Sequence, residues 1–133
     1  MAALNSKLIF ISMKKVIYTE KAPAAIGPYS QAILAGNTLY ISGQIALDLA
    51  PLNDIPAETT RILENIGHIL AEAGMDYSHI VKSSIFLKNM DDFVTVNEVY
   101  GTFFTENPPA RETVQVARLP RDVNVEISVI AVK

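Results

Sequence analysis

The sequence contains no cysteine and only two histidines, His68 and His79. Without cysteine, the chain cannot form disulfides, thiolate zinc sites, iron–sulfur clusters or a cysteine nucleophile. We expect the histidines on a helix surface and in a loop, because no third ligand accompanies them, so a metal site is disfavoured. The absence of cysteine and of a secretory signal together favours a reducing, cytoplasmic setting.

Charged residues are also scarce, at 19% of the chain, and the formal net charge is −3. Proteins that bind nucleic acids or anionic membranes by general electrostatics are normally basic. The sequence also lacks tryptophan and shows no basic stripe interleaved with aromatic residues. We therefore expect neither nucleic acid nor a membrane as a partner. No phosphate-binding loop, dinucleotide fingerprint or nucleophile elbow is present.

The first residues contain only a short apolar run, residues 8–11. This run is too short for a membrane span of roughly 20 residues or for the centre of a secretory signal. Met13 followed by two lysines resembles a second start, so we expect residues 1–12 to be a poorly ordered extension. Organelle targeting is the alternative, since the segment carries no acidic residue. Residues 13–133 then form a single domain, as no repeat or linker divides them.

What the chain does contain is apolar residues, at 50%, enough for a sizeable core without disulfides. Apolar alternation and turn residues predict six strands. The predicted strands span residues 16–19, 31–35, 38–42, 79–88, 111–116 and 123–132. Gly36-Asn37 predicts a tight hairpin turn between the second and third strands, because such turns need positive φ angles. In the fourth strand, alternation places Val81, Ser83, Ile85 and Leu87 on one face.

Two helices are predicted between these strands from start signals, stop signals and apolar stripes. The first starts near Asp54 and Pro56 and ends at Gly74, and the second starts at Asn89 or Asp91 and ends at residues 107–109. The first stripe comprises Ile62, Leu63, Ile66, Ile69 and Leu70, and the second comprises Phe93, Val96, Tyr100, Phe103 and Phe104. The order β-β-β-α-β-α-β-β predicts an α+β fold, a mixed sheet with both helices on one face. We expect neighbouring subunits to cover the other face.

Two charged residues on the last strands are candidates for chemistry. Arg111 opens a strand among small polar neighbours, where a guanidinium could hold a planar carboxylate through two parallel hydrogen bonds. Glu126 lies in mid-strand, where partial burial would raise its pKa and suit it to general-base work. The alternatives are a surface ion pair for Arg111 and an ordinary solvent-facing carboxylate for Glu126.

Two further segments point to a ligand. Residues 25–31 form a rigid Gly-Pro turn that delivers Tyr29, whose phenol could orient water or a substrate heteroatom or could simply pack with its hydroxyl satisfied. Ser42-Gly43 ends a hairpin strand, and glycine permits close approach of a ligand to the backbone. From the residues alone, the chain is a small acidic α+β domain with a possible carboxylate-binding arginine.

The motifs together resemble those of the reactive intermediate deaminase family, also described as the YjgF-like or enamine/imine deaminase family. Six motifs carry the resemblance in the family's order, across nearly the whole chain from residue 16 to residue 132. They span residues 22–31, 39–45, 81–87, 91–100, 109–120 and 125–127. The resemblance implies a chorismate-mutase-like homotrimer with the sheets packed inward as a barrel and clefts between neighbouring subunits.

The resemblance also implies roles for three catalytic residues. Arg111 matches the arginine that binds the substrate carboxylate, and Glu126 matches the carboxylate proposed to position or activate water. Tyr29 matches the tyrosine of the cleft. The implied reaction is hydrolysis of 2-iminobutanoate and 2-iminopropanoate to 2-keto acids and ammonia, without metal or organic cofactor. The alternative is a non-catalytic protein that binds 2-keto acids or related metabolites in the same cleft.

Four more residues match positions that line the family's site. Asn97 matches an asparagine of the second helix, and Ser42 and Gly43 match the strand end beside the ligand. Thr113 stands where many relatives have cysteine. Thiol-based regulation would therefore not apply to this chain, while the hydrolysis itself should be retained.

Overall fold

The computed structural model describes residues 14–133, and the expected extension of residues 1–12 lies outside the described residues. The described part contains the six strands and two α-helices in the predicted order. The strands are β1 (Lys14–Ile17), β2 (Ala32–Ala35), β3 (Thr38–Gln44), β4 (Ile80–Leu87), β5 (Ala110–Gln115) and β6 (Val125–Val132), and the α-helices are α2 (Ile55–Glu72) and α3 (Phe93–Phe103).

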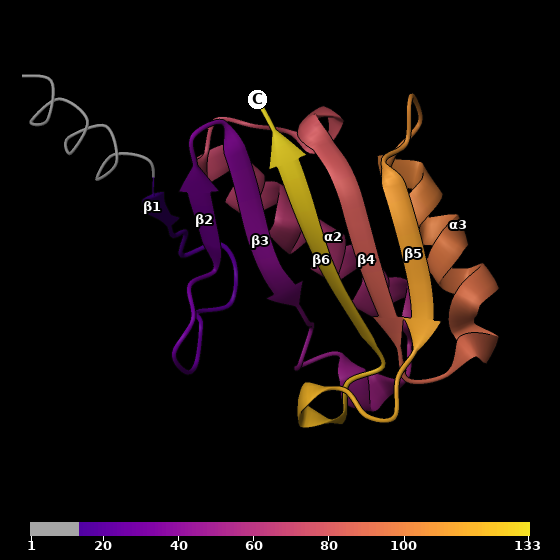
Figure 1. Ribbon diagram of the computed structural model, residues 1–133. Coiled ribbons are helices and arrows are strands. Elements are labelled where there is room, and N and C mark those ends of the chain that lie inside the picture. The colour runs from indigo at the N-terminus through magenta and orange to yellow at the C-terminus, as the bar shows by residue number, and fades with distance from the viewer. Residues whose placement is uncertain (1–13) are drawn as a thin grey trace, which may run out of the picture.

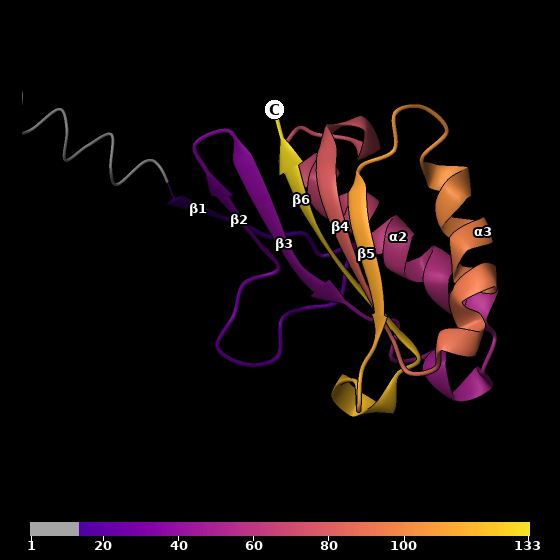
Figure 2. The ribbon, with the colours of Figure 1, turned by 45° about the vertical axis from the view of Figure 1, so that its right-hand side comes forward.

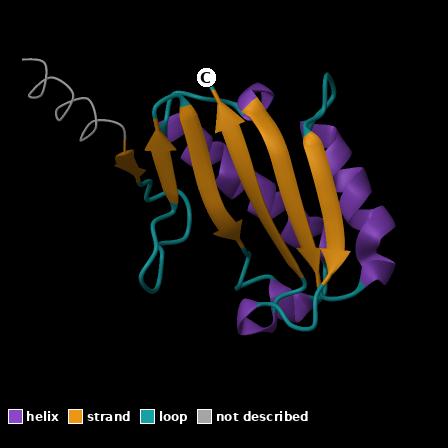
Figure 3. Ribbon diagram, viewed as in Figure 1, coloured by secondary structure: helices purple, strands orange, loops and turns teal. Residues whose placement is uncertain are grey.

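The strands form one mixed sheet in the order β1-β2-β3-β6-β4-β5. Only β4 and β5 run parallel, and every other neighbouring pair is antiparallel. Figures 1 and 2 show α2 and α3 packed on the same face of this sheet, and Figure 3 shows the loops gathered at its two ends. The predicted α+β architecture with both helices on one face is therefore confirmed.

Helix α2 begins and ends where the sequence predicts. The carboxylate of Asp54 accepts a hydrogen bond from the Ala57 N–H at 3.1 Å, and Pro56 occupies the first turn. Gly74 has a φ of 71° just beyond the last turn, a conformation that glycine adopts without strain. All five residues of the predicted apolar stripe are fully buried against the sheet. Burying this stripe supplies most of the stability of the helix.

Helix α3 ends at Phe103, earlier than the predicted stop at residues 107–109. Phe104 leaves the helical conformation with a φ of −129°. Its ring lies 4.5 Å from the ring of Tyr100 and 6.1 Å from that of Tyr77. The ring packs against the core, and the chain leaves the helix before it reaches the prolines.

The hairpin between β2 and β3 is confirmed, with a φ of 60° at Gly36. One prediction for β4 was wrong. Ser83, Ile85 and Leu87 share the buried face, but Val81 is 46% exposed. The pairing of β4 with β6 shifts between Ile80 and Lys82, so Ile80 takes the buried position instead.

The sheet face away from the helices carries a mixture of apolar and polar side chains. On β6 the buried residues face the helices, whereas Glu126 and Ser128 lie on the open face. The same face holds exposed apolar groups, including Tyr40 at 50% and Val114 at 40% exposure. Such a surface would suit contact with another subunit, as the sequence analysis expects.

A buried carboxylate ties the start of α2 to the start of β6. Glu58 is fully buried, and its Oε2 accepts hydrogen bonds from the Asn124 N–H at 3.0 Å and the Val125 N–H at 3.1 Å. Its Oε1 accepts a third from the Asn124 side-chain amide at 2.8 Å. The carboxylate therefore satisfies the backbone donors that lead into the strand carrying Glu126.

Replacing Glu58 by alanine would leave these buried donors without acceptors. We expect the Glu58→Ala variant to lose about 3 kcal/mol of unfolding free energy, measured by urea denaturation. Glu64, which is exposed on the same helix, is the control, and Glu64→Ala should change stability by less than about 0.5 kcal/mol. Equal losses in the two variants would contradict the role assigned to the Glu58 carboxylate.

Candidate active site

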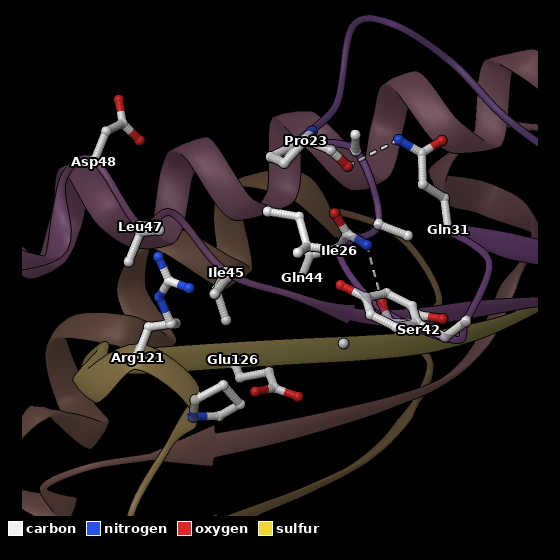
Figure 4. Close-up of a pocket in the computed structure, with 15 residues that line it drawn as sticks. Pro23, Ile26, Gln31, Ser42, Gln44, Ile45, Leu47, Asp48, Arg121 and Glu126 are labelled. Atoms are coloured by element: carbon white, nitrogen blue, oxygen red, sulfur yellow. Dashed lines mark hydrogen bonds between the residues drawn. The ribbon is translucent and has the colours of Figure 1, made fainter.

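A pocket of about 910 Å³ opens beside the ends of β3 and β6. Its walls come from the loop after β1, the end of β3 with the loop that follows, and the turn before β6. The lining residues are Pro23, Ala24, Ala25, Ile26, Tyr29, Gln31, Ser42, Gly43, Gln44, Ile45, Leu47, Asp48, Pro120, Arg121 and Glu126 (Figure 4). Most of the lining surface is apolar, so the polar side chains that reach it would set the orientation of a ligand.

Glu126 reaches this pocket from β6 and lies against the backbone of Gly43. The register of β3 against β6 shifts between Ile41 and Gln44, which displaces Ser42 and Gly43 from regular pairing. A Cβ at position 43 would lie 2.8 Å from the Glu126 Cδ, so glycine lets the carboxyl group take this position and any larger residue would displace it. Burial raises the pKa of Glu126. A half-buried carboxylate with a raised pKa is suited to take a proton from water.

The side chain of Gln31 holds the loop that forms the opposite wall. Its Oε1 accepts from the Thr19 N–H at 2.8 Å, and its Nε2 donates to the carbonyls of Thr19 at 3.1 Å and Pro23 at 2.9 Å. The Gln31 backbone carbonyl also accepts a hydrogen bond from the Ser42 N–H of β3 at 3.0 Å, although regular β2 begins at Ala32, one residue later than predicted. The loop is thereby fixed beside β3.

Tyr29 and Ser42 complete the polar lining at the mouth. The Tyr29 N–H donates to the Gly27 carbonyl at 2.9 Å in the predicted turn, and the Tyr29 side chain is 54% exposed. The Ser42 hydroxyl donates to the Ser30 carbonyl at 2.6 Å. The Ser42 hydroxyl therefore fixes the strand end, and the Tyr29 phenol remains available to a ligand.

Arg111 belongs to a second cluster, on the helix side of β5. Its guanidinium donates to the Asn97 Oδ1 at 2.5 Å and lies 4.9 Å from the ring centroid of Tyr100 and 5.9 Å from that of Phe93. Stacking on the two aromatic rings and the hydrogen bond to the Asn97 side-chain amide hold the guanidinium in place. It has no carboxylate partner among residues 14–133. The surface ion pair weighed for this residue is thus absent from the described part of the chain.

Thr113 lies near this cluster and not in the pocket. Its hydroxyl oxygen is buried and has no hydrogen-bond partner among the described residues. A buried hydroxyl without a partner is uncommon in folded proteins. Arg111, Asn97 and Thr113 therefore form one group of predicted site residues, and Tyr29, Ser42, Gly43 and Glu126 form the other.

Within one chain the two groups are well separated. Arg111 pairs with Ser83 on β4 and Glu126 pairs with Phe86, so three residues and two strand spacings lie between them. Strand geometry then places their Cα atoms about 14 Å apart. Arg111 faces the helices whereas Glu126 faces the open side. One chain alone therefore does not unite the arginine with the carboxylate.

Sequence reasoning missed two features of the pocket. Gln31 falls in the predicted second strand, and nothing local in the sequence marks its side chain as one that binds backbone groups of the preceding loop. The predicted strand ranges leave Arg121 in the connection between the last two strands, and nothing local in the sequence marks it as a lining residue. His68 lies on the surface of α2 as predicted, whereas His79, predicted in a loop, ends a short 3-10 helix (Tyr77–His79), where its Nδ1 accepts a hydrogen bond from the Asp76 N–H at 3.0 Å.

Within residues 14–133 no group of three acidic or histidine side chains is arranged to hold a metal ion. The helices of this part of the chain are too short or too polar to cross a membrane.

The family model described as Endoribonuclease L-PSP matches residues 19–133. A 2-iminobutanoate/2-iminopropanoate deaminase of Mus musculus is 50% identical over 125 residues, which cover 91% of this chain and 93% of the mouse protein. The crystal structure of YyfA from Yersinia pestis, of the conserved Rid protein family, has a TM-score of 0.85 at 46% identity and covers 90% of this chain and 99% of that one. The crystal structure of E. coli TdcF with bound serine has a TM-score of 0.83 at 41% identity, with the same coverage.

Proposed function

The chain belongs to the Endoribonuclease L-PSP family, that of the YjgF-like reactive intermediate deaminases, and on this premise we propose that it hydrolyses short 2-imino acids. The substrates are 2-iminobutanoate and 2-iminopropanoate, and the products are the 2-keto acids and ammonia. One observation carries the proposal: the half-buried Glu126 carboxylate lies in a mostly apolar pocket, against the backbone of Gly43, where no side chain displaces it. The cytoplasmic location expected from the sequence stays part of this proposal.

Glu126 moves the protons of the reaction. Its carboxylate accepts a proton from water as the water oxygen bonds to the imine carbon, and the carboxylic acid so formed gives this proton to the imine nitrogen. Glu126 then transfers the hydroxyl proton of the carbinolamine to the amine nitrogen, the C–N bond breaks as the C=O bond forms, and ammonia leaves. Imines hydrolyse in water without a catalyst, so the ~10²–10⁴-fold effect of a positioned acid or base would suffice. Tyr29 aligns the water or the nitrogen from the pocket mouth.

Arg111 anchors the substrate carboxylate, and we propose that it does so from a neighbouring subunit. Its guanidinium carries free donors next to Asn97, and a bidentate pair would fix the substrate in the plane needed for attack. Because Arg111 and Glu126 point to opposite faces of one sheet, a complete site requires a second copy of the chain. The homotrimer implied by the family motifs would supply it.

The experiment that tests this function follows imine release from threonine. A threonine dehydratase generates 2-iminobutanoate in semicarbazide buffer, and the keto acid released by hydrolysis is measured against the trapped semicarbazone. We expect the parent protein to accelerate keto-acid release and Glu126→Gln to lower the rate by about 10²–10⁴-fold. If the parent gives no acceleration, hydrolysis of this imine is excluded.

A metabolite-binding protein without activity is the second candidate, and the serine bound in the TdcF structure is the observation that favours it. Both binding and hydrolysis would require Arg111, so only a substitution at Glu126 distinguishes the two candidate functions. A sensor would bind 2-oxobutanoate equally well in the parent and in Glu126→Gln, by titration calorimetry, and neither protein would turn over imine. Cleavage of RNA, which the description of the family suggests, is disfavoured by the net charge of −3.

A further inference from the structure

Arg121 occupies a strained turn at the edge of the pocket. Its φ is 59°, and that of Asp122 is 57°, so two consecutive residues other than glycine lie in the left-handed region. This conformation is unfavourable for a residue with a side chain, so the surrounding structure must hold both residues there. Two features do so: the flanking residues Leu119 and Val123 are buried, and Arg118 pairs with Asp122 at 2.8 and 3.0 Å.

The turn directs the Arg121 side chain along the wall of the pocket. In Figure 4 its guanidinium points toward Leu47 and Ile45. No hydrogen-bond or ion-pair partner for it exists among residues 14–133. Two carboxylates line the same pocket, but Asp48 pairs with Arg61 at 3.2 Å, and Glu126 forms no ion pair with Arg121. The Arg121 guanidinium is therefore left without an ion-pair partner among the described residues.

We infer that Arg121 recognises a second anionic group, so that the pocket accepts 2-imino acids whose side chain ends in a carboxylate. The inference rests on the proposed function, in which Arg111 holds the carboxylate next to the imine carbon. A guanidinium beside apolar walls gains most from a planar anion that brings two acceptors. The pocket's volume of about 910 Å³ exceeds what an ethyl or methyl side chain fills, which leaves room for the longer acid.

A matched pair of substrates tests this inference. L-Aspartate oxidase releases 2-iminobutanedioate and threonine dehydratase releases 2-iminobutanoate, and these differ only in the terminal carboxylate. The measured quantity is the ratio of kcat/KM for the diacid to that for the monoacid. We expect Arg121→Asn to lower this ratio at least tenfold, and Arg121→Lys to restore part of it. Asparagine tolerates the left-handed conformation, so the fold should persist.

Lys14→Gln is the control, because it removes one exposed positive charge on β1, outside the pocket lining. This variant should leave the ratio unchanged. If Arg121→Asn leaves the ratio unchanged, Arg121 does not select the diacid. If it lowers kcat/KM for both imines equally, the guanidinium acts on the group they share, and the inference is likewise overturned.

Binding separates a failure of this inference from a failure of the proposed function. If the parent hydrolyses neither imine, the proposed function fails, and affinity for the two keto acids still tests Arg121. Calorimetry should then show that Arg121→Asn weakens binding of 2-oxobutanedioate at least tenfold relative to 2-oxobutanoate. Equal weakening of both ligands, or none, would overturn the inference independently of catalysis.

Discussion

Replacement of Arg111 by alanine is expected to lower kcat/KM for 2-iminobutanoate by about 10²–10⁴-fold, because removing one partner of the buried pair between Arg111 and the substrate carboxylate would cost about 3–5 kcal/mol. The guanidinium holds no carboxylate of the described chain, so the substrate would be its natural partner. Arg111→Met is the second variant, since it keeps an aliphatic stem above Tyr100. It should lose comparable activity while retaining the thermal stability of the parent. Full activity in either variant would remove Arg111 from the site.

The same variant tests whether two subunits build each site. Arg111→Ala and Glu126→Gln are each nearly inactive, and we would unfold them together in equal amounts and refold the mixture. If Arg111 and Glu126 come from neighbouring subunits, about a quarter of the interfaces should pair two intact halves, with activity to match. Sites that lie within one chain would give no recovery, because every chain carries one defect. Light scattering on the refolded mixture would show its oligomeric state.

The elements of this fold were predictable because their signals are local. The stripe on α2, its Asp54 cap and the Gly36 hairpin all depend on neighbours in sequence, and each appears where predicted. The end of α3 was not predictable, because Phe104 turns toward Tyr77, a residue far away in sequence. Local stop signals cannot report a competing contact of that kind.

The residues of the candidate site also divide into those that local signals predict and those that depend on distant contacts. Alternation along β6 separates Glu126 from the buried valines, and the structure agrees. Alternation cannot say which side of the sheet the helices cover, so it could not reveal that Arg111 and Glu126 face opposite sides. The position of Arg121 in the pocket could not be predicted for a different reason. Its position depends on a left-handed turn held by buried flanking residues, and an Arg-Asp pair carries none of the usual signals for that conformation.

Gly43→Ala is expected to lower kcat/KM by about 10²-fold, because a displacement of about 1 Å at a reacting group has an effect of that size. The added Cβ would lie 2.8 Å from the Glu126 Cδ, and the flexible glutamate side chain would turn away from the backbone of β3 at position 43. Gly101→Ala is the matched control, since a Cβ there meets no atom within 4 Å and alanine favours the helix. The control should keep full activity.

The pH profile shows whether the loss in Gly43→Ala arises at Glu126. The base must be ionised, and burial raises its pKa, so kcat/KM of the parent should fall as the pH drops through a value above the usual 4.5. In Gly43→Ala the carboxylate turns toward solvent and its pKa returns downward, which moves this acid limb to lower pH. The variant should therefore lose proportionally less activity than the parent on acidification. An acid limb at the same pH in both proteins would show that the alanine acts elsewhere, and Glu126 would then lose its place as the base.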